Sequence, residues 1–113
     1  TPLYVRDNIH VELMAKGFVY WLENLPLEES TSVFAPAGMI STMGDFVEKV
    51  ASEMRPRLGL ACQVILGPQA DFSQPMVLVN DTPLDHMFDD WNENIAWDAL
   101  AAHQKYLQDQ RNS

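Results

Sequence analysis

The chain has 113 residues, of which 47% are hydrophobic and 20% charged, and its 16 acidic and 7 basic residues give a net charge of −9. This composition excludes a disordered chain and a disulfide-stapled scaffold, and the length suits one hydrophobic core. Seven scattered bases cannot neutralise a track of phosphates, so we expect no nucleic-acid partner and no attachment to an anionic membrane. No stretch approaches the roughly 18 apolar residues needed to span a bilayer.

The first residue is Thr1 rather than Met, and no basic and apolar leader follows it. We therefore expect a cytoplasmic segment of a longer protein. The single cysteine, Cys62, lies in the apolar run 62–66, which excludes an intrachain disulfide and fits a reducing compartment. A buried structural thiol is expected there, rather than a reactive one.

Apolar residues recur at spacings of three and four over residues 11–25, which predicts a helix that ends at Pro26. Residues 27–31 are polar and predict a loop. The β-branched and aromatic run 32–35 then predicts a short buried strand, followed by a turn at 36–38.

Thr42, with Asp45 three residues later, forms a capping pattern for a second helix. Its apolar residues share one face over positions 43–58, and Pro56 and Gly59 mark its end.

Two further strands are predicted, at 62–66 and at 76–79, with an irregular polar loop at 69–74 between them. Thr82 as N-cap and Pro83 at the first helical position, with Asp85 following, predict a short helix that reaches Trp91. A last helix is expected over 95–108. Strands that alternate with helices favour an α/β fold.

Motifs that would carry chemistry are absent from the sequence. The five glycines lack the spacing of a dinucleotide-binding or phosphate-binding loop, and there is no Gly-x-Ser-x-Gly elbow. Neither His10 with Glu12 nor His86 with Asp90 has a third soft ligand nearby, so a transition-metal site is not expected. We predict that this segment itself holds no catalytic residue, no cofactor and no metal.

The most specific part of the chain is the run Arg6-Asp7-Asn8-Ile9-His10-Val11-Glu12-Leu13. It resembles the Arg-Asp-Tyr-Ile-His-Val-x-Asp-Leu segment of extended short-chain dehydrogenases/reductases, the NAD(P)-dependent nucleoside-diphosphate-sugar epimerase/dehydratase family. Asn8 stands where the family usually has Tyr. The order of the predicted elements resembles the family over almost the whole chain. The resemblance implies an α/β fold, the C-terminal segment of an extended Rossmann-type (NAD(P)-binding) enzyme with helices and a few short strands.

The family's catalytic parts lie elsewhere, since none of the three tyrosines here has a Lys four residues later, as the Tyr-x-x-x-Lys pair requires. The resemblance therefore implies the substrate-binding portion of a longer enzyme, with residues 1–60 completing the nucleotide-binding domain and residues 60–113 forming the small substrate domain. NAD or NADP would be bound by the parent enzyme and not by this segment alone. The implied partners are a nucleotide sugar or related small molecule and the missing N-terminal domain.

Arg6 is the first candidate substrate-binding residue, because the Arg of this motif contacts the substrate diphosphate in sugar-nucleotide epimerases. A guanidinium suits phosphate oxygens. The alternative is that Arg6 pairs with a nearby acid, Asp7 or Glu12. By the same resemblance, Asp7 and His10 are structural and hold the turn into the first helix.

Phe72 is the second candidate. It lies in the loop 69–75, which corresponds to an Arg-Pro-Gly-Asp-like stretch that grips the diphosphate in many members of the family. The loop here contains no base, which leaves room for a less anionic substrate. Phe72 either stacks on a substrate ring or anchors the loop by packing.

A different class of function stays open: a non-enzymatic acidic module that binds a partner helix through methionine and aromatic side chains. The residues concerned also fit a plain core, and they are Met87, Phe88, Trp91 and Trp97. On the enzyme interpretation the first helix would pack on the missing sheet, so Phe18, Trp21 or Phe34 would be left exposed. Self-association of the chain is therefore expected.

Overall fold

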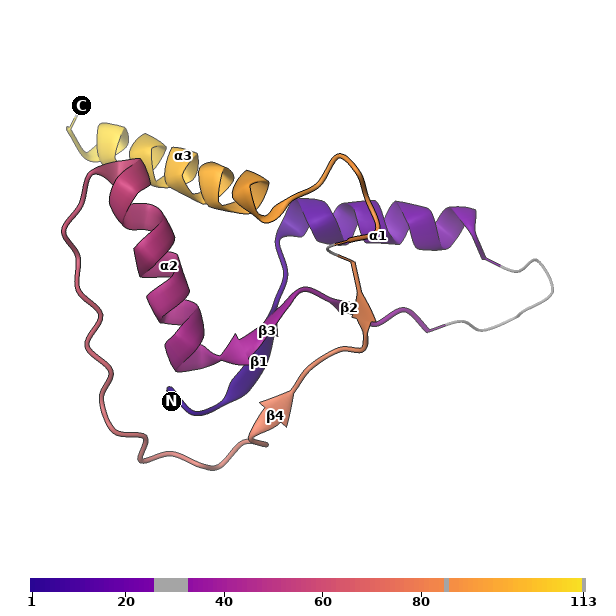
Figure 1. Cartoon of the computed structure of the whole chain (residues 1–113), viewed down its shortest axis with the longest axis horizontal. Coiled ribbons are helices and arrows are strands. Elements are labelled where there is room, and N and C mark those ends of the chain that lie inside the picture. The colour runs from indigo at the N-terminus through magenta and orange to yellow at the C-terminus, as the bar shows by residue number, and fades with distance from the viewer. Residues whose placement is uncertain (26–32, 85, 113) are drawn as a thin grey trace.

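The computed structural model describes residues 1–25, 33–84 and 86–112, and within these ranges it is a mixed α/β structure with three helices and a few short strands (Figure 1). In chain order the elements are β1 (Val5–Asn8), α1 (Val11–Glu23), β2 (Pro36–Ala37), β3 (Met39–Thr42), α2 (Met43–Leu58), β4 (Val77–Leu78), β5 (Thr82–Pro83) and α3 (Glu93–Asn112). The mixed α/β class predicted from the sequence is confirmed. No helix within the described ranges is both long enough and apolar enough to cross a membrane.

β1 is the central strand of a three-stranded sheet with the order β3-β1-β4. It pairs antiparallel with β3, with Val5 opposite Thr42, and parallel with β4, with Val5 opposite Val77. β2 and β5 form a separate parallel pair. The strand predicted at 76–79 is confirmed as β4, whereas β1 and β3 were not predicted from the sequence.

The helix predicted over 11–25 is confirmed as α1, which ends at Glu23. His10 is its N-cap, because the His10 Nδ1 atom accepts a hydrogen bond from the Glu12 N–H at 3.2 Å. Gly17 lies at the contact between α1 and the segment after β5, where a Cβ would lie 2.6 Å from Leu84 Cδ1.

The second predicted helix is confirmed as α2 with its predicted bounds. The Thr42 hydroxyl accepts the Asp45 N–H at 3.1 Å, so the predicted cap forms. Gly59 ends the helix in the left-handed region, at φ 65°, and its N–H donates to the Arg55 carbonyl. Pro56 lies inside the last turns of α2 and does not end the helix.

Two small hydrophobic clusters hold the elements together. Leu13 of α1, Leu84 and Trp91 form the first cluster. The second joins α2 to α3 through Met54, Trp97 and Ala101. α3 is longer than the predicted 95–108 and packs against α2, and the two helices converge toward the C-terminal end of α2 (Figure 1). Elements make contact across the expected domain boundary near residue 60. The pairs include α2 with α3, β1 with β4, and β2 with β5.

Two sequence predictions after α2 are wrong. Residues 62–66 form no strand but part of an extended segment along α2, and Cys62 is exposed rather than buried. An apolar run gives a strand only where a neighbouring strand pairs with its backbone groups, and no described strand does so here.

The short helix predicted from Thr82 to Trp91 is also wrong. The Thr82 N–H donates to the Ala35 carbonyl at 3.0 Å and the Leu84 N–H to the Ala37 carbonyl at 3.3 Å, so pairing with β2 replaces the first helical turn. Asp85, the expected third residue of that turn, lies outside the described residues.

The strand predicted at 32–35 lies just before the observed one. Ser32 and the loop 27–31 fall outside the described residues, and Val33 to Ala35 are not in a strand. β2 instead occupies Pro36–Ala37, where the turn was predicted.

Candidate functional site

Arg6 lies in the middle of the sheet on β1, and its side chain reaches across to the segment that leads into β4. Its Nη1 donates to the carbonyls of Val5, at 2.8 Å, and Met76, at 3.4 Å, while its Nη2 donates to Gln74 Oε1 at 3.2 Å. The guanidinium carbon sits 4.5 Å from the centre of the Tyr4 ring, within cation–π range. The sheet therefore holds the guanidinium against the loop before β4.

Tyr4 also holds this loop in place. It is buried, with only 3% of the residue exposed. Its hydroxyl donates to the Asp71 carbonyl and accepts the Gln74 N–H, both at 3.1 Å. The loop is tied a third time where Gln69 Oε1 accepts the Leu3 N–H at 2.7 Å. These bonds give the loop 69–76 a defined position although it contains no helix or strand.

The loop carries one carboxylate and no base. The Ser73 hydroxyl and then the Ser73 backbone N–H, which lies 2.9 Å from Asp71 Oδ1, hydrogen-bond this carboxyl and lower the pKa of Asp71 below its usual range. Asp71 is therefore ionised at neutral pH. Arg6 supplies the positive charge in this cluster.

Both sequence-predicted site residues lie in this cluster, which we call the Arg6 site and define as Arg6 with the loop 69–76. Phe72 is two residues from Gln74, the side-chain partner of Arg6. Its side chain is 56% exposed, so Phe72 does not anchor the loop by burial.

The alternative role of Arg6, an ion pair with Asp7 or Glu12, is not observed. Within the described ranges no carboxylate lies within ion-pair distance of Arg6. Asp7 instead accepts hydrogen bonds from the backbone N–H groups of Gly38, at 2.7 Å, and Asn80, at 3.1 Å. Asp7 thus has a structural role, because it joins β1 to the segments at Gly38 and Asn80. His10 caps α1 and so holds the turn into that helix.

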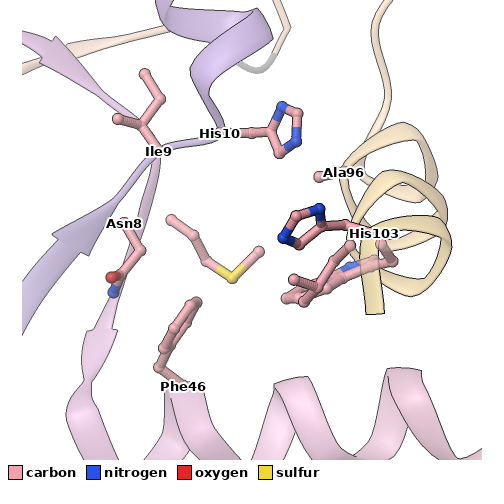
Figure 2. A pocket seen from close by; sticks show the side chains of 9 residues that line it. Asn8, Ile9, His10, Phe46, Ala96 and His103 are labelled. Atoms are coloured by element: carbon pink, nitrogen blue, oxygen red, sulfur yellow. The ribbon is translucent and has the colours of Figure 1, made fainter. Parts of the chain in front are cut away.

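A concave region lies where β1, α2 and α3 meet, and we call it the helix pocket (Figure 2). Its volume is about 410 Å³, and its lining includes Phe46 of α2 and Ala96 of α3. The side chains of His10 and His103 enter it from different elements, with Asn8 on the strand side. Sequence reasoning missed this pocket, because packing of α3 on α2 brings residues together that show no pattern along the chain.

Neither metal-binding groups in the described residues nor comparisons with known proteins assign a function to the chain. Among the residues that the structure describes, no three His, Cys, Asp or Glu side chains are grouped so as to hold a metal ion. No protein-family model, curated protein or solved structure matches the chain. A functional assignment therefore depends on the chain's own residues.

The residues of the alternative interaction surface are largely part of the core. Trp91 is 8% exposed and Trp97 4%, so each belongs to one of the two clusters. Phe88 is half-buried against the first cluster, and Met87 is exposed. Neither tryptophan is available on a free surface to anchor a partner helix.

Proposed function

We propose that the chain is the substrate-binding portion of an NAD(P)-dependent nucleoside-diphosphate-sugar epimerase/dehydratase, and that Arg6 binds a phosphate of the substrate. One observation carries the proposal. Arg6 is held in place by three bonds to uncharged oxygens and has no carboxylate partner within the described residues. Its positive charge is therefore left for an anion, and its Nε–H is left as a donor.

Phe72 supports the same assignment. An exposed aromatic ring on a loop that is tied down by Tyr4 and Arg6 can stack on a base or sugar ring with little loss of chain entropy. The site contains one base, Arg6, and one ionised carboxylate, Asp71. A single guanidinium balances less negative charge than two bases would. We expect one phosphate group to contact Arg6.

In this proposal the segment binds and orients, and chemistry belongs to the rest of the enzyme. NAD or NADP would supply hydride transfer, with a Tyr-x-x-x-Lys pair for proton transfer, in the parent chain. This segment would hold the substrate so that its sugar faces that machinery.

The proposal is tested by calorimetric titration of the chain with uridine, thymidine and guanosine diphosphates and with the matching nucleosides. We expect at least one diphosphate to bind, and its nucleoside to bind more weakly. Arg6→Gln should weaken diphosphate binding roughly ten-fold or more, because a charge-assisted hydrogen bond to phosphate contributes about 1.5–3 kcal/mol.

Arg57→Gln is the matched control, since the Arg57 guanidinium is already paired with Glu53 and Asp98 between α2 and α3. It should leave diphosphate binding unchanged. Equal binding by the Arg6→Gln chain, or equal binding of diphosphate and nucleoside, would contradict the proposal.

A further inference from the structure

We propose that the helix pocket binds a small uncharged aromatic molecule that carries a hydroxyl group. The pocket is separate from the Arg6 site, and the inference does not depend on the proposed function. A volume of about 410 Å³ lies within the range of small-molecule sites, roughly 300–1,000 Å³.

The walls of the helix pocket favour a ring. Phe46 and Trp97 line it from α2 and α3, and Met39 adds a polarisable thioether. The Trp97 indole N–H already donates to Glu93 Oε1 at 2.7 Å, so this residue offers the ligand ring surface and no hydrogen-bond donor. Trp97 is 4% exposed and therefore forms a fixed wall.

The polar groups of the pocket favour a hydroxyl. His10 Nδ1 is occupied by the Glu12 N–H, so the proton of the neutral His10 imidazole lies on Nε2, which can donate. His103 comes from the opposite side, on α3, and its side chain enters the same space (Figure 2). A hydroxyl between the two rings can accept from His10 and donate to His103.

The absence of charged side chains among the described residues that line the pocket favours an uncharged ligand. No Lys, Arg, Asp or Glu lines it, so a charged group bound there would lose its hydration without gaining a counter-charge.

The experiment is a titration of the 113-residue chain with 4-methylphenol and with toluene, followed by the indole N–H signals in ¹⁵N–¹H NMR spectra. These two probes share a methyl-substituted ring and differ in the hydroxyl group. We expect saturable binding of 4-methylphenol that shifts the Trp97 signal, and several-fold weaker binding of toluene.

Four variants test the site, three of them in the pocket lining and one outside it. Ala96→Leu places a larger side chain in the pocket, and Leu100→Phe does so from the next turn of α3, so both should weaken 4-methylphenol binding at least ten-fold. Ala102→Leu makes the first of these changes at an exposed position of α3 outside the pocket lining and should have no effect. His10→Asn keeps an N-capping residue for α1 but removes the imidazole, so it should remove the preference for 4-methylphenol over toluene.

The inference is overturned if 4-methylphenol does not bind, if it binds equally to the folded Ala96→Leu or Leu100→Phe chain, or if toluene binds as tightly. Far-UV circular dichroism of each variant identifies which of the two pocket-filling chains has folded.

Discussion

Asp7 joins backbone groups from two distant segments, the Gly38 N–H at 2.7 Å and the Asn80 N–H at 3.1 Å. Asp7→Asn keeps the shape of the side chain but replaces one acceptor oxygen with an NH2 group, which donates and cannot accept. We expect a loss of about 1–3 kcal/mol in the free energy of unfolding, because one N–H is left without its partner. Urea denaturation measures this change.

Asp98→Asn is the control for Asp7, since its carboxylate forms an exposed ion pair with Arg57. Exposed pairs contribute about 0–1 kcal/mol. A loss for Asp7→Asn no larger than that of the control would show that the cross-link does not hold the sheet.

Gly38 lies where β2 and β3 meet against β1, and here the lack of a side chain matters. A Cβ at Gly38 would lie 2.5 Å from the Asn8 carbonyl oxygen and 2.7 Å from Ile9 Cα. Because these are largely backbone atoms that cannot move aside, Gly38→Ala should destabilise the fold by about 1–3 kcal/mol, as overpacking does. At Gly67 nothing lies within 4 Å of a Cβ, so the thermal midpoint of Gly67→Ala should match the wild type.

At the residue scale, the sequence was a good guide where a motif was local. The run from Arg6 to Leu13 drew attention to Arg6, Asp7 and His10, and each has a defined contact in the structure. The sequence could not show that Arg6 would meet Gln74, because that contact depends on the pairing of β1 with β4. No sequence pattern predicted that His103 would line the helix pocket.

At the element scale, two ion pairs link α2 to α3, between Lys49 and Glu93 at 3.2 Å and between Arg57 and Asp98 at 2.8 Å. Glu53 of α2 pairs with both of these bases within its own helix. The Glu53 carboxylate accepts from Arg57 Nη1 at 2.6 Å and pairs with Lys49 at 3.1 Å. Hydrogen bonds from Arg57 and then from Lys49 lower the pKa of Glu53. A folded-state pKa below the unfolded value, which is about 4.3, means that this carboxylate stabilises the fold above that pH.

We therefore expect the stabilisation by Glu53 to be lost as the pH falls from about 5 through its lowered folded-state pKa. Glu53→Gln should destabilise the chain at pH 7 and make the decline in thermal midpoint below pH 5 shallower. Glu48→Gln lies on the same helix, without an ion pair within the described residues, and should leave that decline unchanged. Parallel declines for wild type and Glu53→Gln would contradict this account.

The elements also show what sequence patterns can predict. α1, α2 and α3 were predicted because a 3.6-residue period and cap residues such as Thr42 are local signals. The helix expected after Thr82 gave way to pairing between β5 and β2, which is a contact between distant segments. The strand expected at 62–66 failed for the opposite reason, since no described strand pairs with it.

At the scale of the whole molecule, the chain is open for its size. The radius of gyration is 17.3 Å, against about 13 Å for a compact domain of this length. One face of α1 exposes Phe18, Val19 and Leu22, at 45%, 55% and 58%. Trp21 and Phe34, two further residues expected to be exposed, are half-buried and stack on each other at 5.6 Å.

This exposed apolar surface underlies the prediction of self-association. The net charge of −9 opposes contact between two copies, and added salt screens that repulsion. We expect the mass measured by sedimentation to rise with concentration in the micromolar range, and to rise further in 0.5 M salt. A monomer mass that is independent of both would contradict the prediction.

The central claim, a substrate-binding portion of an NAD(P)-dependent epimerase/dehydratase, is tested most directly by reading the coding sequence upstream of Thr1 in its source. The account predicts an in-frame extension with a Gly-rich strand-turn-helix and a Tyr-x-x-x-Lys pair. An initiator codon directly before Thr1 would contradict it.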